Sequence, residues 1–481
     1  MSIKLYQNTS LYQDTTHSVG KLLELIKSKN NFPTINIIEK KLINLTSQVA
    51  LALDEDNIET MDLKLASIES KIKTLIQLIN FATSQKQLTS EQEKTLESAL
   101  NLVQQKVNNF PLKRRNILIL SSVMGQGHMS ASKALKQGIE HLYGKDYCVT
   151  IIDFYEAIGS LFNKATVKAY EGSTKHLPSF YKYFFENTDS KWQVQFLNLI
   201  NYPLNAGKLE KLFKSYSPHI IISAFPVWDY LASLVMKKCG DIKFLSVVTD
   251  SISIHHAWVT GDPDFHLVPN TETAISLKKL GAPEEKIKVL GFPVKLEFST
   301  PHFRSEFIKN FNLDPHNFTI VLLPTAEKTI STIKMVEEIN RNFPQSNLFV
   351  ICGRNKELYP KLEQFQHQGN TRIIGWTDQM PEFIKNCDLV ITKAGGATVM
   401  ECIAAQKPMI ITQVIPGQEM GNAELIKDHD LGIIQKSAKM SISECVKYIQ
   451  NNHSRFIKNL SDISRPHASL DIAKFINEQI R

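Results

Sequence analysis

The sequence predicts an α/β protein with two successive strand-and-helix domains, preceded by an all-helical extension. Short strands that are apolar throughout recur after residue 115, separated by stretches of helical length. Such strands are typical of parallel sheets that helices cover on both faces. The pattern restarts after Gly291, and 481 residues are too many for a single core. Residues 1–110 show helical periodicity instead.

The composition excludes several classes of protein. With 43% hydrophobic and 21% charged residues, the chain resembles ordinary globular protein. Its net charge of +7 favours anionic surfaces but gives little reason to expect nucleic acid. The six cysteines are scattered, so we expect reduced core thiols in a cytoplasmic protein and no metal site. No apolar run approaches the roughly 18 residues of a membrane-spanning helix, and the N-terminus lacks an apolar signal core.

The N-terminal extension, residues 1–110, carries two apolar stripes. The first comprises Met61, Leu65, Ile68, Ile72, Leu75 and Ile79; the second comprises Leu96, Leu100, Val103 and Val107. This spacing predicts two helices that pair as an antiparallel hairpin, joined by a third from residues 36–53. Ser90 and Glu93 have the spacing of a capping box for the second stripe. The extension either packs on itself or the rest of the chain, or binds a protein partner or a second copy.

The remaining boundaries follow from the strand pattern. We expect one α/β domain over residues 111–294, a second over 295–465 and a C-terminal helix over 466–481, with a hinge near residues 291–294. The expected strands of the first domain are 116–122, 147–154, 219–225 and 244–250. Those of the second are 318–326, 347–355, 371–376, 387–396 and 407–413. Ligands in such folds bind beyond the carboxyl ends of the strands, where the unusual loops of this chain fall.

The first unusual loop is "VMGQGH". Gly125 and Gly127 form a strand-to-helix turn that leaves backbone N–H groups for an anionic or oxygen-rich group. His128 either stabilises the helix N-terminus or acts as a general base. The third glycine of a dinucleotide fingerprint is absent, because position 130 is Ser. A nicotinamide enzyme, with Asp153 on the ribose, stays open as a rival.

The second loop is "TKAGGATVMECIAA". Gly395 and Gly396 allow close approach of a ligand, and a helix from about Thr398 points its N-terminus at the same place, which suits a diphosphate. Glu401, one turn inward, can bind both hydroxyls of a ribose or can be a solvated helix residue. Gln418, Glu419 and Asn422 follow a Pro-Gly turn and suit the hydroxyls of a sugar.

Two further strands end in "GRN" and "GWTDQ". Backbone groups there can hydrogen-bond the edge of a flat base. Arg354 can contact phosphate, stack on a base, or be an ordinary surface charge.

Together these motifs resemble a known family. In order they are GxGH, "VVTD", "PN-T-T", "GFPV", "CGRN", "GW", "TKAGG-T--E" and "PGQE--NA", over residues 114–465. The chain is similar to the UDP-sugar glycosyltransferases that include plant monogalactosyldiacylglycerol synthases and bacterial diacylglycerol glucosyltransferases. The lipid-linked muropeptide transferase is a more distant relative. The resemblance implies a GT-B fold, with two Rossmann-like domains facing across a cleft and no catalytic metal.

The resemblance also implies roles for single residues. It assigns the diphosphate to Gly395, Gly396 and Thr398, the ribose to Glu401, and the donor sugar to Gln418, Glu419 and Asn422. It places uracil near Gly353, Arg354 and Trp376, and Arg354 or Lys393 beside the leaving UDP. The loop with Gly125, Gly127 and His128 faces the acceptor, and Asp250 is the other candidate base. One departure is "LLPTAEKTIST", where the family often has a glycine-bearing loop; Thr325 and Lys328 are the candidate substitutes.

The expected function is therefore inverting transfer of glucose or galactose from its UDP-sugar to a lipid, with diacylglycerol as the expected acceptor and no cofactor. Residues 155–215 interleave lysines with aromatic residues, which suits either an anionic membrane surface or an aromatic core. We expect a peripheral enzyme on the inner face of the cell membrane. A transferase acting on a polyprenyl-linked sugar and a non-catalytic nucleotide-sugar-binding protein stay open as alternatives.

Overall fold

The computed structural model describes most of the chain outside residues 158–205. The described residues are 10–27, 32–53, 58–108, 115–123, 126–144, 146–153, 157, 206–216, 218–236, 242–301, 304–324, 329–355, 357–366, 370–417 and 419–480. Contacts between residues divide the chain into two compact units. One comprises residues 1–118, 143–150 and 211–219, and the other comprises residues 119–142, 151–210 and 220–481.

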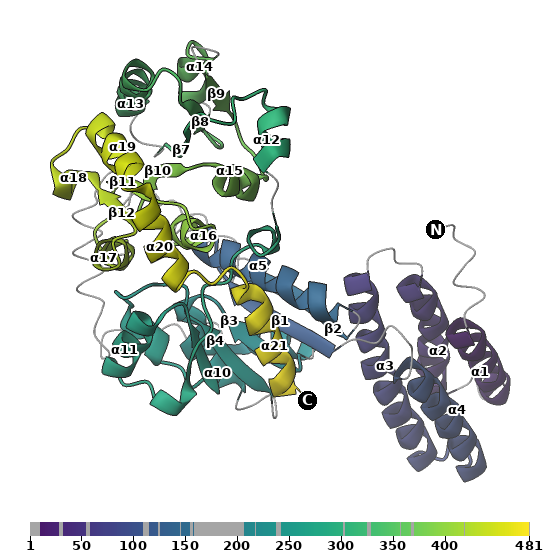
Figure 1. Ribbon diagram of the computed structural model, residues 1–481. Helices are drawn as coiled ribbons and strands as arrows, with labels where there is room; N and C mark the ends of the chain where they lie inside the picture. The colour runs from purple at the N-terminus through teal and green to yellow at the C-terminus, as the bar shows by residue number, and fades with distance from the viewer. Residues whose placement is uncertain are drawn as a thin grey trace. The chain divides into compact units, whose positions relative to one another are not determined.

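The N-terminal extension forms a four-helix bundle of α1 (Ser10–Lys27), α2 (Pro33–Leu53), α3 (Ile58–Ser84) and α4 (Ser90–Asn108) (Figure 1). Each helix contacts the next, and α4 contacts α1. The two predicted stripes are confirmed from Leu65 to Ile79 and from Leu96 to Val107, because these residues fill the bundle core. Met61 has no described side chain. Helix α1 was not predicted, although Val19, Leu22 and Ile26 are spaced three and four apart on its buried face.

The capping box of α4 was predicted one residue too late. Thr89 Oγ1 accepts a hydrogen bond from Gln92 N at 3.2 Å, and Gln92 Oε1 accepts one from Thr89 N at 3.0 Å. Ser90 is already the first helical residue. Two overlapping pairs have the spacing of a capping box, Thr89 with Gln92 and Ser90 with Glu93. Leu88 is buried in the bundle core, which places the turn directly before Thr89.

The first α/β domain is built on a six-stranded sheet. Its strands are β1 (Arg115–Ser121), β2 (Tyr147–Asp153), β3 (Ile220–Ser223), β4 (Lys243–Val247), β5 (Phe265–Val268) and β6 (Ile287–Val289), in the order β2-β1-β3-β4-β5-β6. The pairs from β3 to β6 are parallel. The helices are α5 (Gln126–Tyr143), α10 (Pro226–Met236) and α11 (Thr271–Lys279), with short turns η2 (His256–Val259), η3 (Glu284–Lys286) and η4 (Leu296–Phe298). The four predicted strands are present, whereas the short strands β5 and β6 were not predicted.

The second α/β domain has a parallel sheet in the order β12-β11-β10-β7-β8-β9. Its strands are β7 (Thr319–Leu322), β8 (Asn347–Ile351), β9 (Thr371–Ile374), β10 (Leu389–Lys393), β11 (Met409–Gln413) and β12 (Gly432–Ile434). Its helices are α12 (Arg304–Asn310), α13 (Thr329–Asn342), α14 (Leu358–Glu363), α15 (Met380–Asn386), α16 (Gly396–Ala404), α17 (Met420–Asp428), α18 (Gln435–Ala438) and α19 (Ile442–Asn451).

Successive strand residues in this sheet face opposite cores, which explains why the strands are apolar throughout. Val321 belongs to the core beneath α15, α16 and α17. Its neighbours Ile320 and Leu322 belong to the core beneath α13, α14 and α19. The prediction of a sheet covered on both faces is confirmed.

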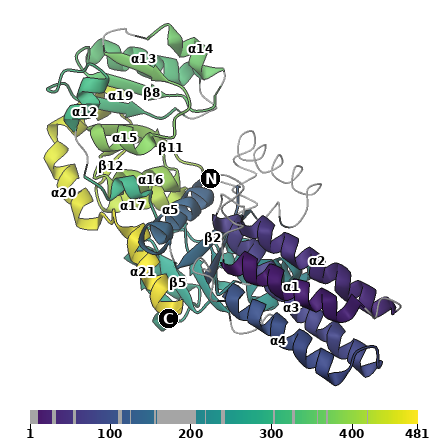
Figure 2. The same ribbon diagram turned by 90° about the vertical axis from the view of Figure 1, so that its right-hand side faces the viewer.

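The chain ends by returning to the first α/β domain. Helix α20 (His453–Ile463) packs on α16, and α21 (Ala468–Ile480) lies beside α5 and β5 (Figures 1 and 2). Ser469 Oγ donates a hydrogen bond to the Val294 carbonyl, and the rings of Phe265 and Phe475 meet edge to face at 5.2 Å. Gly138 on α5 leaves room for this helix, since a Cβ there would lie 2.5 Å from the Ser469 carbonyl oxygen.

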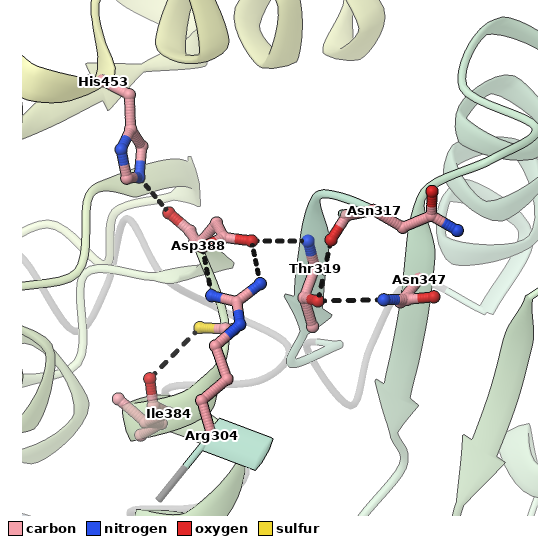
Figure 3. A network of polar contacts seen from close by, with 8 residues as sticks. Arg304, Asn317, Thr319, Asn347, Ile384, Asp388 and His453 are labelled. Atoms are coloured by element: carbon pink, nitrogen blue, oxygen red, sulfur yellow. Dashed lines mark hydrogen bonds and ion pairs between the residues drawn. The ribbon is translucent and has the colours of Figure 1, made fainter. Parts of the chain in front are cut away.

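The amino ends of β7 and β10 are joined by a polar network (Figure 3). Asp388 Oδ1 and Oδ2 accept hydrogen bonds from Arg304 Nη1 at 2.5 Å and Nη2 at 2.8 Å, and Oδ2 also accepts one from Thr319 N at 2.8 Å. His453 on α20 contacts the Asp388 carbonyl at 3.0 Å. The network lies at the sheet edge opposite the predicted ligand loops.

Three other predictions concern the chain as a whole. Cys148, Cys352, Cys387, Cys402 and Cys445 are buried thiols, as predicted, and Cys239 lies outside the described residues. Among the residues described, no helix is both long and apolar enough to span a membrane. Of residues 155–215, the structure describes only residue 157 and residues 206–215. The predicted membrane-facing segment therefore lies largely outside the described part.

Candidate functional site

The predicted donor loops gather along the carboxyl edge of the second sheet. Arg354 follows β8, Trp376 follows β9, Gly395 follows β10 and Glu419 follows β11. Strand β7 lies between β8 and β10, but residues 325–328, including Thr325 and Lys328, lie outside the described residues. Gln418 also lies outside them.

Helix α16 presents an uncapped N-terminus at this edge. Its N-cap is Gly395, which has no side chain to accept a hydrogen bond from the first turn. A Cβ on Gly395 would lie 3.4 Å from Lys393 Cε, and a Cβ on Gly396 would lie 3.5 Å from Asn422 Nδ2. Glycine therefore leaves the helix end open, and its N–H groups and positive dipole end suit an anionic group such as a diphosphate.

Lys393 and Glu419 form an ion pair beside this helix end. The other carboxylate oxygen of Glu419 accepts a hydrogen bond from Ile415 N at 3.0 Å, and its side chain is buried. Lys393 is 42% exposed, so its ammonium group stays accessible from the helix end. Glu419 thus holds Lys393 in place and supports the loop that follows β11.

Asn422 on α17 has one engaged and one open polar atom. Its Nδ2 donates to the Ala394 carbonyl at 2.9 Å, while its buried Oδ1 has no hydrogen-bond partner among the described residues. A buried acceptor without a donor is costly, so a ligand hydroxyl that donates here would be favourable.

Glu401 is buried, which excludes the alternative of a solvated helix residue. Burial raises the pKa of its carboxyl to about 7; Lys295 acts to lower this pKa and Glu297 to raise it. Lys295 and Glu297 both line a cavity of about 590 Å³, which Asp378 and Gln379 also line. Glu401 itself does not line this cavity, but two of the charged residues that do line it act on its carboxyl. Lys295 was not predicted, although it directly follows the "GFPV" motif.

Arg354 and Trp376 contact each other across adjacent strand ends. The Arg354 guanidinium lies over the Trp376 ring, 5.4 Å from its centroid, and Trp376 is 58% exposed. Gly353 has φ +60°, a conformation that glycine adopts without strain, and it turns the chain after β8. The pair forms an exposed planar platform of the kind on which a nucleobase can stack.

On the first domain, His128 lies buried in the first turn of α5. Its Nδ1 lies 2.6 Å from Thr249 Oγ1, and its ring meets Phe225 edge to face. Burial lowers the pKa of His128, while Asp250 and a hydrogen bond to the Ala224 backbone act to raise it. Burial therefore favours the neutral form of the imidazole. Thr249 was not predicted, although it stands beside Asp250 in "VVTD".

Asp250 is the second candidate base, and its Oδ2 accepts a hydrogen bond from Trp258 Nε1 at 2.7 Å. Gly125 lies outside the described residues. Asp153, considered above for a nicotinamide ribose, is buried, and its Oδ2 accepts a hydrogen bond from Val123 N at 2.6 Å. Asp153 thus stabilises the loop after β1.

The glycine loops of the two α/β domains meet each other. A Cβ on Gly127 would lie 4.0 Å from the Ala397 amide nitrogen in α16. A Cβ on Gly396 would lie 3.9 Å from the Thr249 carbonyl oxygen. The end of α16 is consequently adjacent to the residue that holds His128, so a helix end suited to an anion and the imidazole lie close together.

Comparisons with known proteins agree with this arrangement. Residues 128–294 match the family model of monogalactosyldiacylglycerol (MGDG) synthase, and residues 326–474 match that of the glycosyltransferase family 28 C-terminal domain. A probable chloroplastic monogalactosyldiacylglycerol synthase 3 of Oryza sativa subsp. japonica is 28% identical over 80% of this chain and 78% of its own length. A processive diacylglycerol beta-glucosyltransferase of Staphylococcus carnosus is 27% identical over 71% of this chain and 86% of its own length.

A solved structure described as the glycotransferase of kitacinnamycin has a TM-score of 0.51 and 14% identity, covering 76% of this chain and all of that one. At this identity the likeness concerns the fold alone. The two sheets, the returning C-terminal helix and the tandem family domains confirm the predicted architecture. The chain is a glycosyltransferase with the GT-B fold, and its two α/β domains are similar to MGDG synthase and to the glycosyltransferase family 28 C-terminal domain respectively.

Proposed function

We propose that the protein transfers a hexose from UDP-glucose or UDP-galactose to a diacylglycerol-type lipid, with inversion at the anomeric carbon. The observation that carries the proposal is the approach of Gly127 and of Thr249, the partner of His128, to the N-terminus of α16. This approach brings a proton acceptor next to a site for a leaving diphosphate. The named relatives act on diacylglycerol or make its galactolipid, which supports the choice of acceptor.

In this proposal the donor lies along the carboxyl edge of the second sheet. Gly395, Gly396 and Thr398 bind the diphosphate through the N-terminus of α16, and Glu401 binds the ribose hydroxyls. The uracil occupies the end of the cavity near Asp378, against the platform of Gly353, Arg354 and Trp376. Gln418, Glu419 and Asn422 surround the sugar; the open Oδ1 of Asn422 supports a hydroxyl there.

The reaction is a single displacement. His128, with or without Asp250, takes the proton of the acceptor hydroxyl, and the hydroxyl oxygen bonds to the anomeric carbon. The bond from that carbon to the diphosphate oxygen breaks, and its electron pair leaves with UDP. The dipole of α16 and the Lys393 ammonium stabilise the departing charge, a type of interaction that can supply about 3 kcal/mol to a transition state.

The place of action follows from the acceptor. A diacylglycerol substrate stays in a bilayer, so we propose that the enzyme works peripherally on an anionic membrane surface at the inner face of the cell membrane. The net charge of +7 supports this. The helical bundle is proposed to bind a protein partner or a second copy of the chain. Sedimentation with anionic and neutral vesicles tests the first proposal, and light scattering with and without residues 1–110 tests the second.

The decisive experiment incubates the full chain with each UDP-hexose and diacylglycerol liposomes, followed by mass spectrometry of the lipids. A monohexosyl diacylglycerol supports the proposal. Transfer only to an added polyprenyl-linked sugar would favour the alternative acceptor. UDP binding without any transfer would favour a nucleotide-sugar-binding protein, and NAD binding without UDP binding would favour a nicotinamide enzyme.

A further inference from the structure

The turn directly after Asp250 has an unusual backbone. Ile252 has φ +58°, a region that β-branched residues rarely adopt. Ser253 N donates to the Ser251 carbonyl at 2.7 Å, which closes the turn within three residues. Strained backbone of this kind persists only where surrounding contacts enforce it, and it is frequent at functional sites.

The N-terminus of α11 supplies the enforcing contacts. Thr273 Oγ1 accepts a hydrogen bond from Ile252 N at 3.0 Å, and Asn270 Nδ2 donates to Ser251 Oγ at 3.0 Å. Asn270 Oδ1 in turn accepts from Thr273 N at 2.9 Å and Thr273 Oγ1 at 2.7 Å. The same two side chains therefore cap α11 and hold the turn.

On its other side the turn touches α17 of the second domain. A Cβ on Gly421 would lie 1.9 Å from the Ser251 carbonyl oxygen and 2.6 Å from Ser253 N, so only glycine fits. Ile252 packs against the core of the second domain. The far end of α17 is also tied to α11, since His429 Nε2 lies 2.7 Å from Glu272 Oε1.

Helix α17 carries Asn422, whose open Oδ1 belongs to the proposed sugar site, one residue after Gly421. The turn carries Asp250 immediately before Ser251. The contact between Ser251 and Gly421 consequently joins the candidate base of one domain to the sugar-binding helix of the other. Ile252 and Thr273 lie outside the donor loops. Gly421 stands between Glu419 and Asn422 but is not among the residues assigned to the diphosphate.

We propose that the turn of Ser251, Ile252 and Ser253, held by Asn270 and Thr273, is a positioning element that fixes α17 against the acceptor side through Gly421. Its residues act through Asp250 and Asn422, so they are positioning residues. The inference rests on the proposed hexosyl transfer. It adds a specific contact that aligns the sugar-binding residue Asn422 with the candidate general base Asp250.

Two substitutions test the contact from its two sides. Thr273→Val keeps the side-chain shape but removes the acceptor for Ile252 N, and Gly421→Ala pushes the Ser251 carbonyl away. Each is expected to lower kcat about 10- to 100-fold, because misplacement of reacting groups by an ångström costs rate on that scale. The Kd of UDP alone, measured by calorimetry, should stay within about twofold, because the α16 end and Glu401 are unchanged.

Matched controls separate positioning from general damage. Thr371→Val removes another buried threonine hydroxyl, bonded to Asn340 at the amino end of β9. Gly207→Ala adds a Cβ where nothing lies within 4 Å. Both controls should keep kcat and UDP affinity. The double variant Thr273→Val/Gly421→Ala should lose far less than the product of the single losses, since both act through one contact.

The outcomes are distinct. If the wild type makes glycolipid and Thr273→Val does so at an unchanged rate, the positioning role is overturned. It is equally overturned if kcat, UDP affinity and melting temperature fall together, since that pattern reports a structural role. If the wild type binds UDP but transfers no hexose, the proposed function fails first and the positioning role with it.

Discussion

The Thr249 hydroxyl lies 2.6 Å from His128 Nδ1, so a residue at the end of one strand fixes the imidazole that begins α5. The neighbouring residue, Asp250, is held by Trp258. Thr249 is therefore the group that orients the proposed base, and a histidine with one ring nitrogen fixed presents its proton-accepting state in a defined direction.

Thr249→Val should lower kcat about 10- to 100-fold. The variant removes the hydroxyl group that orients the imidazole but keeps the shape of the side chain packed around it. Burial lowers the pKa of His128 below its ordinary 6.5, so wild-type activity should persist somewhat below pH 6.5 and fall as the ring becomes protonated. Lipid-transfer rates across pH measure both effects. Ser132→Ala, which removes a buried hydroxyl from the next turn of α5, serves as the control. Equal turnover of Thr249→Val and wild type would contradict the orienting role.

Glu401→Ala should weaken UDP binding about 10- to 100-fold, the usual range for hydrogen bonds to a charged group. Because the pKa of Glu401 is raised to about 7, its carboxyl becomes charged as pH rises through neutrality. The ionised form is the better acceptor for ribose hydroxyls, so wild-type UDP affinity should increase between about pH 6 and pH 8.

Calorimetry at several pH values measures this dependence, and Glu401→Gln should abolish it. The exposed Glu424→Gln on α17 is the control, with wild-type behaviour expected. A UDP affinity that is the same for Glu401→Ala and wild type would remove the ribose assignment.

Asp229 predicts how stability depends on pH. It is fully buried, with Oδ2 accepting from Ser246 Oγ at 2.6 Å, and burial raises its pKa from 3.8 to about 8. The folded protein therefore holds a proton that the unfolded chain releases above about pH 4, so stability is lost as pH rises towards 8. The free energy of unfolding at pH 7 is lower than that below pH 4 by at most about 4 kcal/mol. Asp229→Asn, which carries no such proton, should melt at a temperature less sensitive to pH. An identical pH dependence in both proteins would show that Asp229 is ionised when folded.

Arg304→Met should destabilise the second domain by about 1–3 kcal/mol, because it leaves the partly buried Asp388 without its bidentate partner (Figure 3). Burial alone would raise the pKa of Asp388, but Arg304 and Thr319 N outweigh burial and lower it. The contribution is therefore present above pH 3.8 and is lost as pH falls through the lower folded pKa.

Thermal melts measure the Arg304 effect. The control is Arg455→Met, which removes a more exposed partner of Asp430 and should cost less than about 1 kcal/mol. Equal losses for the two variants would contradict a special role for the network at the amino ends of β7 and β10.

Local patterns predicted the parts of this molecule that depend on neighbours in sequence. The stripes of α3 and α4, the apolar strands and the glycine-bearing strand ends are visible because burial on one or both faces constrains each residue type. Three short strands were not predicted: β5, β6 and β12, which have three or four residues each. The capping box of α4 was misplaced by one residue because two registers satisfy the same local rule.

From local sequence patterns alone, the chain was expected to form packed helices at its N-terminus, two parallel sheets covered on both faces, and a row of loops suited to phosphate at the carboxyl ends of the strands. The fold was needed to find that Thr249 holds His128, that Lys295 and Glu297 act on the pKa of Glu401, and that Gly421 meets the Ser251 carbonyl. The residues of each pair lie between about 100 and 170 positions apart in the sequence, and their contacts arise from how sheets and helices pack. Periodicity and spacing report which residues of one segment are buried. A site between two domains depends on the packing of segments that are distant in the sequence, which no local pattern reports.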